Sequence, residues 1–298
     1  GVDHAGLACH RLHISTLGQW TTPRKPHLSI SDIQCAPHRF TRRYDQWVDH
    51  YENFPVASWL CPPALRAPIL ALYAYARTAD DIADEGDATA AQRLEALRQY
   101  RQDLHAIWRD PHHCSQRWPE VFAALARQHQ TWAFPLGLLE DLLDAFEQDV
   151  NYTQERRVYT HRNELLDYCR RSANPIGRLI LHLVKVQDAQ SLAMSDAICS
   201  ALQLVNFWQD LSVDVPRGRL YLPAGASLLD ELAYARQLME QGAPLVRRLP
   251  GRLGWELRLV VQGGLRILDK SERQDTRQFR PVLGAWDTPR MFWRSLWM

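Results

Sequence analysis

The feature that most constrains the fold of this chain is a helical spacing of apolar side chains that continues from Tyr44 almost to the C-terminus. Apolar residues recur three and four positions apart, which places them on one face of an α-helix, and no segment alternates like a half-buried strand. Prolines separate the segments and suit helix ends. We therefore predict one all-α domain over residues 39–298. Its helices are expected near residues 64–84, 90–109, 117–130, 136–150, 163–186, 195–214, 227–248 and 251–270.

Residues 1–38 differ from the rest of the chain. They contain five histidines and three prolines and show no helical period. We expect them to be a leader that is disordered or not native to the domain, and we assign them no chemistry.

Charge and composition exclude several classes of protein. The chain carries 35 Lys and Arg against 34 Asp and Glu, so no net field marks a protein that binds nucleic acid. Its six cysteines lack CxxC spacing, which favours reduced thiols and a cytoplasmic location. No stretch is apolar over the roughly 18 residues that suggest a membrane-spanning helix. Any membrane contact would be peripheral, at the inner membrane. The tryptophan-rich C-terminal tail could lean on a membrane or pack against the domain, and packing is the default expectation.

An acidic motif ends the first predicted helix, at residues 80–85 (DDIADE). Residues four apart share a helix face, so Asp80 and Asp84 project side by side and repel each other. A hard divalent cation such as Mg²⁺ takes oxygen ligands and would compensate this repulsion. A solvated acidic helix end before the turn at Gly86 explains this motif alone equally well.

A polar stripe lies on a later helix that is otherwise apolar. Gln203, Asn206, Asp210 and Asp214 recur at spacings of three, four and four, so they share one face among Leu, Val, Phe and Trp. Buried amides and carboxylates cost several kcal/mol unless they are paired or bind a metal. A satisfied core network is the alternative, and the pattern favours metal binding.

A short basic loop follows the stripe at residues 216–223 (PRGRLYLP). Arg217 and Arg219 suit diphosphate oxygens because a guanidinium group binds them in pairs. The two acidic motifs and this loop predict a site in which metal ions bridge carboxylates to a diphosphate leaving group while arginines neutralise the remaining charge.

At these residues the sequence resembles the squalene/phytoene synthase family, from about residue 44 to the C-terminus. The first family signature is similar to residues 73–84, and the second to residues 203–214 followed by 217–223. Residues 50–54 resemble an early segment that lines the diphosphate site of the family. The resemblance implies the isoprenoid synthase helical bundle with a central apolar cavity, Mg²⁺ as cofactor, and head-to-head chemistry on prenyl diphosphates.

Residues 50–58, 168–177 and 206–210 look most like the hydroxysqualene synthase branch, the HpnC type of bacterial hopanoid pathways. Phytoene synthases usually carry Arg in place of Gln209 and a different run in place of residues 172–177. The resemblance implies an enzyme that ionises presqualene diphosphate and lets water quench the cation to give hydroxysqualene, without NADPH. It also implies a companion presqualene diphosphate synthase and a hydroxysqualene reductase.

Two other functions stay open. One is a synthase that condenses two prenyl diphosphates, such as farnesyl diphosphate, into presqualene diphosphate, squalene or phytoene; a reductive step would then require NADPH. The other is a non-catalytic family member that acts as an assembly or binding protein, against which both intact acidic motifs argue.

The motifs and the resemblance together assign the site. The catalytic residues are Asp80, Asp84, Asp210, Asp214, Tyr73 and Arg77. The metal ligands, directly or through water, are Asp80, Asp84, Asn206, Asp210 and Asp214. The substrate-binding residues are His50, Asn53, Phe54, Arg77, Tyr168, Asn174, Gln203, Asn206, Arg217, Arg219 and Tyr221. The candidates for an aromatic wall, each also explained as plain core, are Phe54, Tyr73, Phe207 and Trp208, and the water-holding candidates are Asn174, Gln203 and Gln209.

Overall fold

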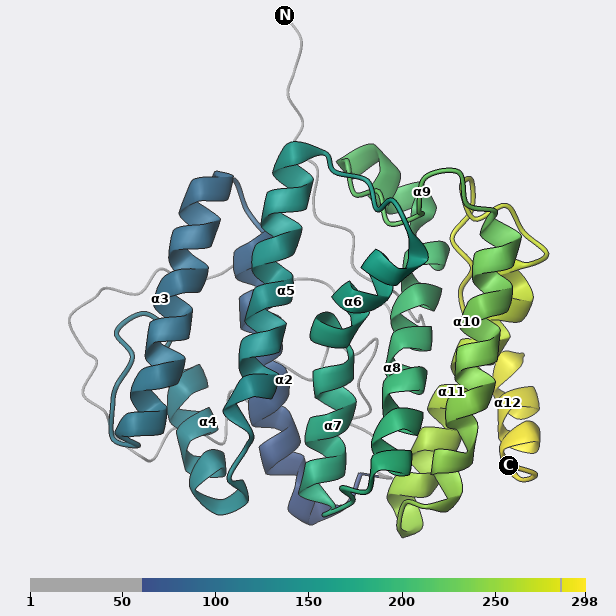
Figure 1. Ribbon diagram of the computed structural model, residues 1–298. Helices are drawn as coiled ribbons and strands as arrows, with labels where there is room; N and C mark the ends of the chain where they lie inside the picture. Colours follow the sequence, from purple (N-terminus) through teal and green to yellow (C-terminus); the bar gives the residue numbers. More distant parts are fainter. Residues whose placement is uncertain (1–60, 285) are drawn as a thin grey trace, which may run out of the picture.

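The computed structural model describes residues 61–284 and 286–298, and the long elements within this part are all helices (Figure 1). They are α2 (Pro63–Asp84), α3 (Ala90–Arg109), α4 (Pro119–Trp132), α5 (Leu136–Glu155), α6 (Arg162–Ser172), α7 (Asn174–Leu183), α8 (Ala189–Gln209), α10 (Leu228–Gly242), α11 (Gly251–Ser271) and α12 (Asp287–Ser295). The short elements are α9 (Leu211–Asp214) and the 3₁₀ helices η2 (Val215–Arg217) and η3 (Ala243–Arg247). These two ranges contain no strand, only an isolated parallel bridge between Val158 and Leu220. The all-α prediction is confirmed. The proposed leader and the start of the domain at residue 39 lie outside the described residues.

Local sequence explains several helix starts. Thr89 begins α3 with a capping box: its hydroxyl accepts a hydrogen bond from the Gln92 N–H at 3.3 Å, and its own N–H donates to the Gln92 side chain at 2.9 Å. Asp188 caps α8 by accepting from the Ser191 N–H at 3.0 Å. These contacts satisfy N–H groups that have no partner within the helix.

Two predicted helices are broken in the structure. The segment predicted near residues 163–186 forms α6 and α7, separated at Ala173, because Pro175 lacks the N–H that would continue the helical hydrogen bonds. The segment predicted near residues 195–214 forms α8 and α9, with Asp210 at their junction (φ −99°, ψ 12°). The polar stripe therefore crosses a helix junction.

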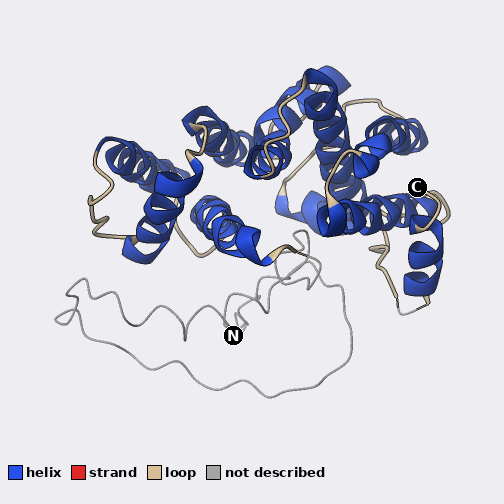
Figure 2. Cartoon of the chain, turned by 90° about the horizontal axis from the view of Figure 1, so that it is seen from below, coloured by secondary structure: helices blue, strands red, loops and turns tan. Residues whose placement is uncertain are grey.

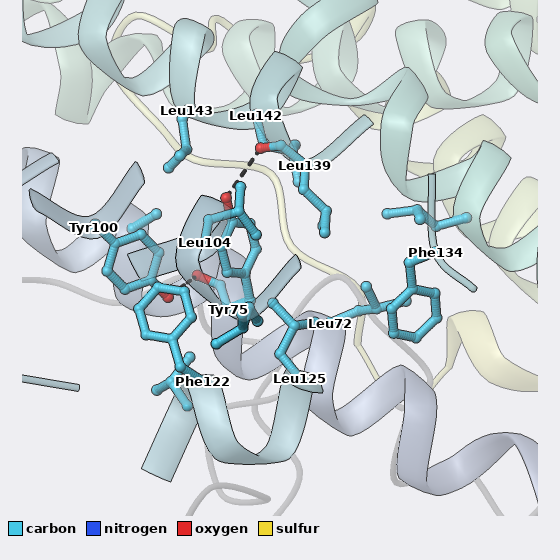
Figure 3. Close-up of a cluster of buried hydrophobic side chains, with 14 of the residues drawn as sticks. Leu72, Tyr75, Tyr100, Leu104, Phe122, Leu125, Phe134, Leu139, Leu142 and Leu143 are labelled. Atoms are coloured by element: carbon cyan, nitrogen blue, oxygen red, sulfur yellow. Dashed lines mark hydrogen bonds between the residues drawn. The ribbon is translucent and has the colours of Figure 1, made fainter. Parts of the chain in front are cut away.

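Buried tyrosines tie α2 to its neighbours in the core that α2, α3, α4 and α5 share (Figure 3). The Tyr75 hydroxyl donates to the Leu139 carbonyl of α5 at 3.1 Å, and the Tyr100 hydroxyl of α3 donates to the Tyr75 carbonyl at 3.0 Å. The two rings stack with centroids 5.2 Å apart, and both side chains are fully buried. These bonds satisfy hydroxyl groups that would otherwise be costly to bury, and they fix α2 against α5.

Helix α8 belongs to two further cores. Leu204 and Trp208 pack with buried residues of α5, α6, α10 and α11, whereas Ile198 and Ala201 pack with residues of α7, η3 and α11. In Figure 1, α2, α5 and α8 all run upward and end in the upper part of the bundle, where α9 also lies. Figure 2 shows the same segments from below, again as helices joined by loops.

The tryptophan-rich tail packs against the domain through α12 and Met298, but not through its tryptophans as expected. Trp286, Trp293 and Trp297 are 94%, 61% and 73% exposed. Helix α12, which the sequence analysis did not predict, contacts α11 through other side chains. None of the described helices is long and apolar enough to cross a membrane. The four described cysteines are free, as predicted.

Gly242 marks a close approach between α10 and α8. A methyl group at this position would lie 2.6 Å from the Met194 carbonyl oxygen and 2.5 Å from the Ile198 side chain. Because helix backbones cannot yield without cost, Gly242→Ala is expected to lower the free energy of unfolding by about 1–3 kcal/mol.

The matched control is Gly137→Ala, at an exposed helical position with open space around it. That change is expected to raise the free energy of unfolding by about 0.5–1 kcal/mol, since it removes only the flexibility of glycine. Urea unfolding measures both. Equal effects of the two changes would contradict the close packing.

Candidate active site

Arg77 neutralises much of the acidic motif on α2. Its guanidinium group contacts Asp80 at 3.0 Å, Asp81 at 2.6 Å and Glu85 at 2.8 Å. Asp84 is not among these partners. The last turns of α2 therefore present one arginine against four carboxylates.

Asp84 is paired by a residue from the other motif. Arg219 donates to the Asp84 carboxylate at 3.0 Å, although 135 positions separate the two residues. The loop that carries Arg219 is held by the bridge between Val158 and Leu220 and by the Ala224 N–H, which donates to the Tyr159 carbonyl at 3.0 Å. The structure thus brings the basic loop against the first acidic motif.

The second acidic motif meets an arginine that the sequence analysis missed. Arg280, in the segment between α11 and α12, pairs with Asp210. The neighbouring Gln209 side chain donates to the Pro281 carbonyl at 2.5 Å. A single C-terminal segment therefore contacts the end of α8 twice. Close to these contacts, burial, and next the charge of Asp210, raise the pKa of Asp214 to about 6.

A pocket of about 570 Å³ lies beside this segment. Lys270, Asp275, Phe279, Arg280 and Val282 contribute to its lining. Since charged side chains form much of this wall, the pocket is not the central apolar cavity of the sequence analysis, which stays a prediction.

Asp149, on α5, is a second residue that the sequence analysis missed. It lines one pocket together with Tyr159, Arg219 and Tyr221, and it accepts a hydrogen bond from the Tyr168 hydroxyl. Burial raises its pKa to about 7, and the charges of Asp84 and Asp214 act in the same direction. A signal was present: Asp149 follows the buried Leu142 and Ala145 at spacings of seven and four, so it falls on the apolar face of its helix.

Carboxylates outnumber arginines around these contacts. The carboxylates are Asp80, Asp81, Asp84, Asp149, Asp210 and Asp214, and the arginines are Arg77, Arg217, Arg219 and Arg280. Burial, and next the charge of Asp84, raise the pKa of Asp80 to about 7. Crowded acids with raised pKa values form a site that a further cation would stabilise.

Aromatic rings cover one side of this group. Tyr221 stacks on Phe207 with centroids 3.9 Å apart and an interplanar angle of 11°, and Tyr159 and Tyr168 lie 6.1 Å and 6.3 Å from Tyr221. Trp208 is fully buried in the core around α8. Phe207 and Tyr221 thus lie beside the charges, whereas Trp208 serves the core.

The remaining predicted residues are placed as follows. Asn174 is buried and its side-chain oxygen accepts from the Ser200 hydroxyl at 2.9 Å. Gln203 and Asn206 are half-buried on α8, and Arg217 is exposed. Tyr73 packs against the core around Tyr75, two turns before the acidic motif. His50, Asn53 and Phe54 lie outside the described residues.

The predicted metal ligands offer only oxygen donors, which fits Mg²⁺ better than a transition metal. Within the described ranges, no three His, Cys, Asp or Glu side chains form a group that could hold an ion by themselves. Arginines already pair Asp84 and Asp210. Because Mg²⁺ usually keeps several waters and binds one or two carboxylates plus substrate phosphates, this donor set suits it.

Comparisons with known proteins agree with the fold and the motifs. Residues 48–226 match the family model described as squalene/phytoene synthase. The hydroxysqualene synthase of Zymomonas mobilis is 37% identical over 177 residues, which are 58% of this chain and 55% of that protein. The hydroxysqualene synthase of Rhodopseudomonas palustris is 37% identical over 248 residues, which are 75% of this chain and 80% of that protein. The chain therefore spans little more than half of the first relative and most of the second.

A solved structure extends this similarity to the fold. The crystal structure of squalene synthase HpnC from Alicyclobacillus acidocaldarius is 31% identical and matches with a TM-score of 0.66, covering 76% of this chain and 90% of that chain.

The raised pKa of Asp149 predicts a pH-dependent stability difference. In the folded state the Asp149 carboxyl keeps its proton up to about pH 7, whereas an aspartate in an unfolded chain has its ordinary pKa of 3.8. Ionisation therefore favours the unfolded chain as the pH rises between these two values. Asp149→Asn keeps an acceptor for Tyr168 and removes the ionisation. We expect Asp149→Asn to raise the free energy of unfolding above that of wild type, and to raise it by more at pH 8 than at pH 4.5.

Urea unfolding in the presence of a chelator measures this difference. Asp87→Asn, at an exposed position, is the control and should show no such trend. A gain for Asp149→Asn that does not change with pH would show that Asp149 ionises normally in the folded chain.

Proposed function

The chain belongs to the squalene/phytoene synthase family, and we propose that it is a hydroxysqualene synthase, converting presqualene diphosphate and water into hydroxysqualene and diphosphate. The single observation that supports this most is the contact between Arg219 and Asp84, which joins the basic loop to the first acidic motif. The relatives from Zymomonas mobilis and Rhodopseudomonas palustris both carry the name hydroxysqualene synthase. We further propose that the reaction serves squalene and hopanoid biosynthesis.

The proposed reaction begins when the carbon–oxygen bond to the diphosphate breaks and the electron pair leaves on oxygen. Arg77 and Arg219, which pair with Asp80 and Asp84 in the structure, would donate to the departing oxygens, and Arg217 would add its charge from the exposed side. Mg²⁺, when bound at Asp80, Asp84, Asn206, Asp210 and Asp214, would neutralise the diphosphate charge. Substrate phosphates would then compete with the carboxylates for the same arginines.

Loss of diphosphate leaves a carbocation that needs electron-rich walls and one controlled water. The stacked rings of Tyr221 and Phe207 offer aromatic faces beside the site. Addition of the water oxygen to the cation, followed by loss of one proton, gives the alcohol. This sequence needs no reductant, so NADPH is not required.

The side-chain contacts of the three water-holding candidates support a choice among them. Gln209 donates to the Pro281 carbonyl, and the side-chain oxygen of Asn174 accepts from Ser200. Gln203 has no side-chain hydrogen bond to the described part of the chain, and it shares the stripe with Asn206. These contacts favour Gln203 as the residue that positions the water.

The alternative within the family is a synthase that condenses two prenyl diphosphates, such as farnesyl diphosphate, into presqualene diphosphate, squalene or phytoene. The same carboxylates and arginines would serve the first ionisation there. A hydroxysqualene synthase depends on a companion enzyme that makes presqualene diphosphate, and its own product, hydroxysqualene, would pass to a reductase. A purely assembling role has no support from the site, because both acidic motifs are intact.

Removal of one carboxylate tests the role of the acidic residues. Asp84→Asn and Asp210→Asn should each lower turnover roughly a hundredfold or more, since each removes charge that holds Mg²⁺ against the leaving group. Turnover is measured with and without Mg²⁺. The Asp87→Asn protein is the control and should keep wild-type turnover.

Near-normal turnover of both site variants would reject the assignment. Circular dichroism of each variant establishes that a loss of turnover does not reflect unfolding.

Substrate choice distinguishes the proposed reaction from its alternative. Purified protein is incubated with Mg²⁺ and presqualene diphosphate, without NADPH, beside a parallel incubation with farnesyl diphosphate. We expect hydroxysqualene, identified by mass spectrometry, from the first incubation alone. Product from farnesyl diphosphate alone would instead identify a condensing synthase, and no product from either would favour the non-catalytic alternative.

A further inference from the structure

Helix α12 has an unusual distribution of side chains. Its buried positions are Asp287 and Ser295, whereas its largest apolar side chains point outward. The exposed set, here called the α12 apolar face, consists of Trp286, Phe292, Trp293, Leu296 and Trp297. A helix that only covers a core shows the opposite arrangement, with its apolar stripe inward.

Polar contacts hold α12 in place. The buried Asp287 carboxylate accepts from Arg266 at 2.6 Å, from the Gly284 N–H at 2.8 Å and from Lys270. At the other end, Arg258 donates to the Ser295 carbonyl at 2.9 Å. The helix is therefore attached without using its large apolar side chains, which remain available for a partner.

The exposed apolar residues form one continuous face. Trp286, Trp293 and Trp297 are spaced by seven and four residues, and the rings of Trp293 and Trp297 lie 6.2 Å apart. Phe292 and Leu296 are four residues apart beside this row. Clusters of large exposed apolar residues are uncommon on protein surfaces and mark contact sites.

The charges on α12 indicate what this face contacts. Its only acidic side chain, Asp287, is buried in ion pairs. Arg290 and Arg294 are exposed beside the tryptophans, and Arg294 also lies 3.8 Å from Asp269 of α11. Arg290 lies four residues after Trp286 and three before Trp293, within the same row. A symmetric contact between two copies of this face would place arginines opposite arginines. An anionic partner with an apolar interior avoids that repulsion.

We propose that the α12 apolar face docks on the surface of an anionic lipid membrane. Tryptophan side chains favour the boundary between headgroups and acyl chains, and arginines favour anionic headgroups. The helix would lie along this boundary without crossing the membrane. The inference does not depend on which reaction the enzyme catalyses.

Vesicle flotation with the purified full chain tests the proposal. Vesicles of phosphatidylcholine alone are compared with vesicles that also contain phosphatidylglycerol. We expect the wild-type chain to float with the anionic vesicles and to bind less as salt increases. The double variant Trp293→Ser and Trp297→Ser should bind at least about tenfold more weakly, because it loses two interfacial anchors.

Two matched controls separate the face from general surface properties. Leu229→Ser removes an apolar side chain that is 62% exposed on α10, and it should bind vesicles like wild type. Arg290→Glu should weaken binding to anionic vesicles, whereas Arg109→Glu, at an exposed position on α3, should not. Thermal unfolding of each variant confirms that it is folded.

The proposal is overturned if wild type floats with neither kind of vesicle, or if the double tryptophan variant binds like wild type. Light scattering tests the other occupant. If wild type binds no vesicles and is a dimer, whereas the double variant is a monomer, the membrane proposal is also overturned. In that case the face is a contact between two copies of the chain.

Discussion

The ion pair between Arg219 and Asp84 is the contact on which the candidate site depends. It connects the end of α2 to the loop after η2, and so joins motifs that are 135 residues apart. The partners are positioned independently: buried tyrosines fix α2 against α3 and α5, and backbone contacts near Tyr159 hold the loop. Two separately supported elements thus meet in one contact, which sets the distance between the acidic motifs.

The site holds more acid than the described arginines neutralise, and burial makes this excess costly. Asp80 and Asp149 both have pKa values raised to about 7, for the same first reason, removal of the carboxylate from water. Such a site is less stable alone than with bound cations. Binding of Mg²⁺ with a diphosphate would therefore order the same residues that it uses and would also add to the stability of the fold.

Sequence alone predicted most of the helices because local patterns determine them. The bounds predicted for α3, 90–109, match the structure, since Thr89 and Gln92 form a capping box at its start. The family was recognised from two local motifs and is confirmed by the match over residues 48–226. By contrast, Arg280 reaches Asp210 across 70 residues, and no local period indicates such a pair. The orientation of α12 was also unpredictable, because its apolar face lacks a partner in the described chain.

The segment between α11 and α12 has a mechanical consequence. Arg280 and Pro281 contact the end of α8, and Asp287, only seven positions after Arg280, anchors α12 to α11. A displacement of α12 would therefore act close to the contacts of Asp210 and Gln209. On the proposal that α12 docks on a lipid surface, the same contacts would couple that docking to Asp210 and Gln209 at the end of α8.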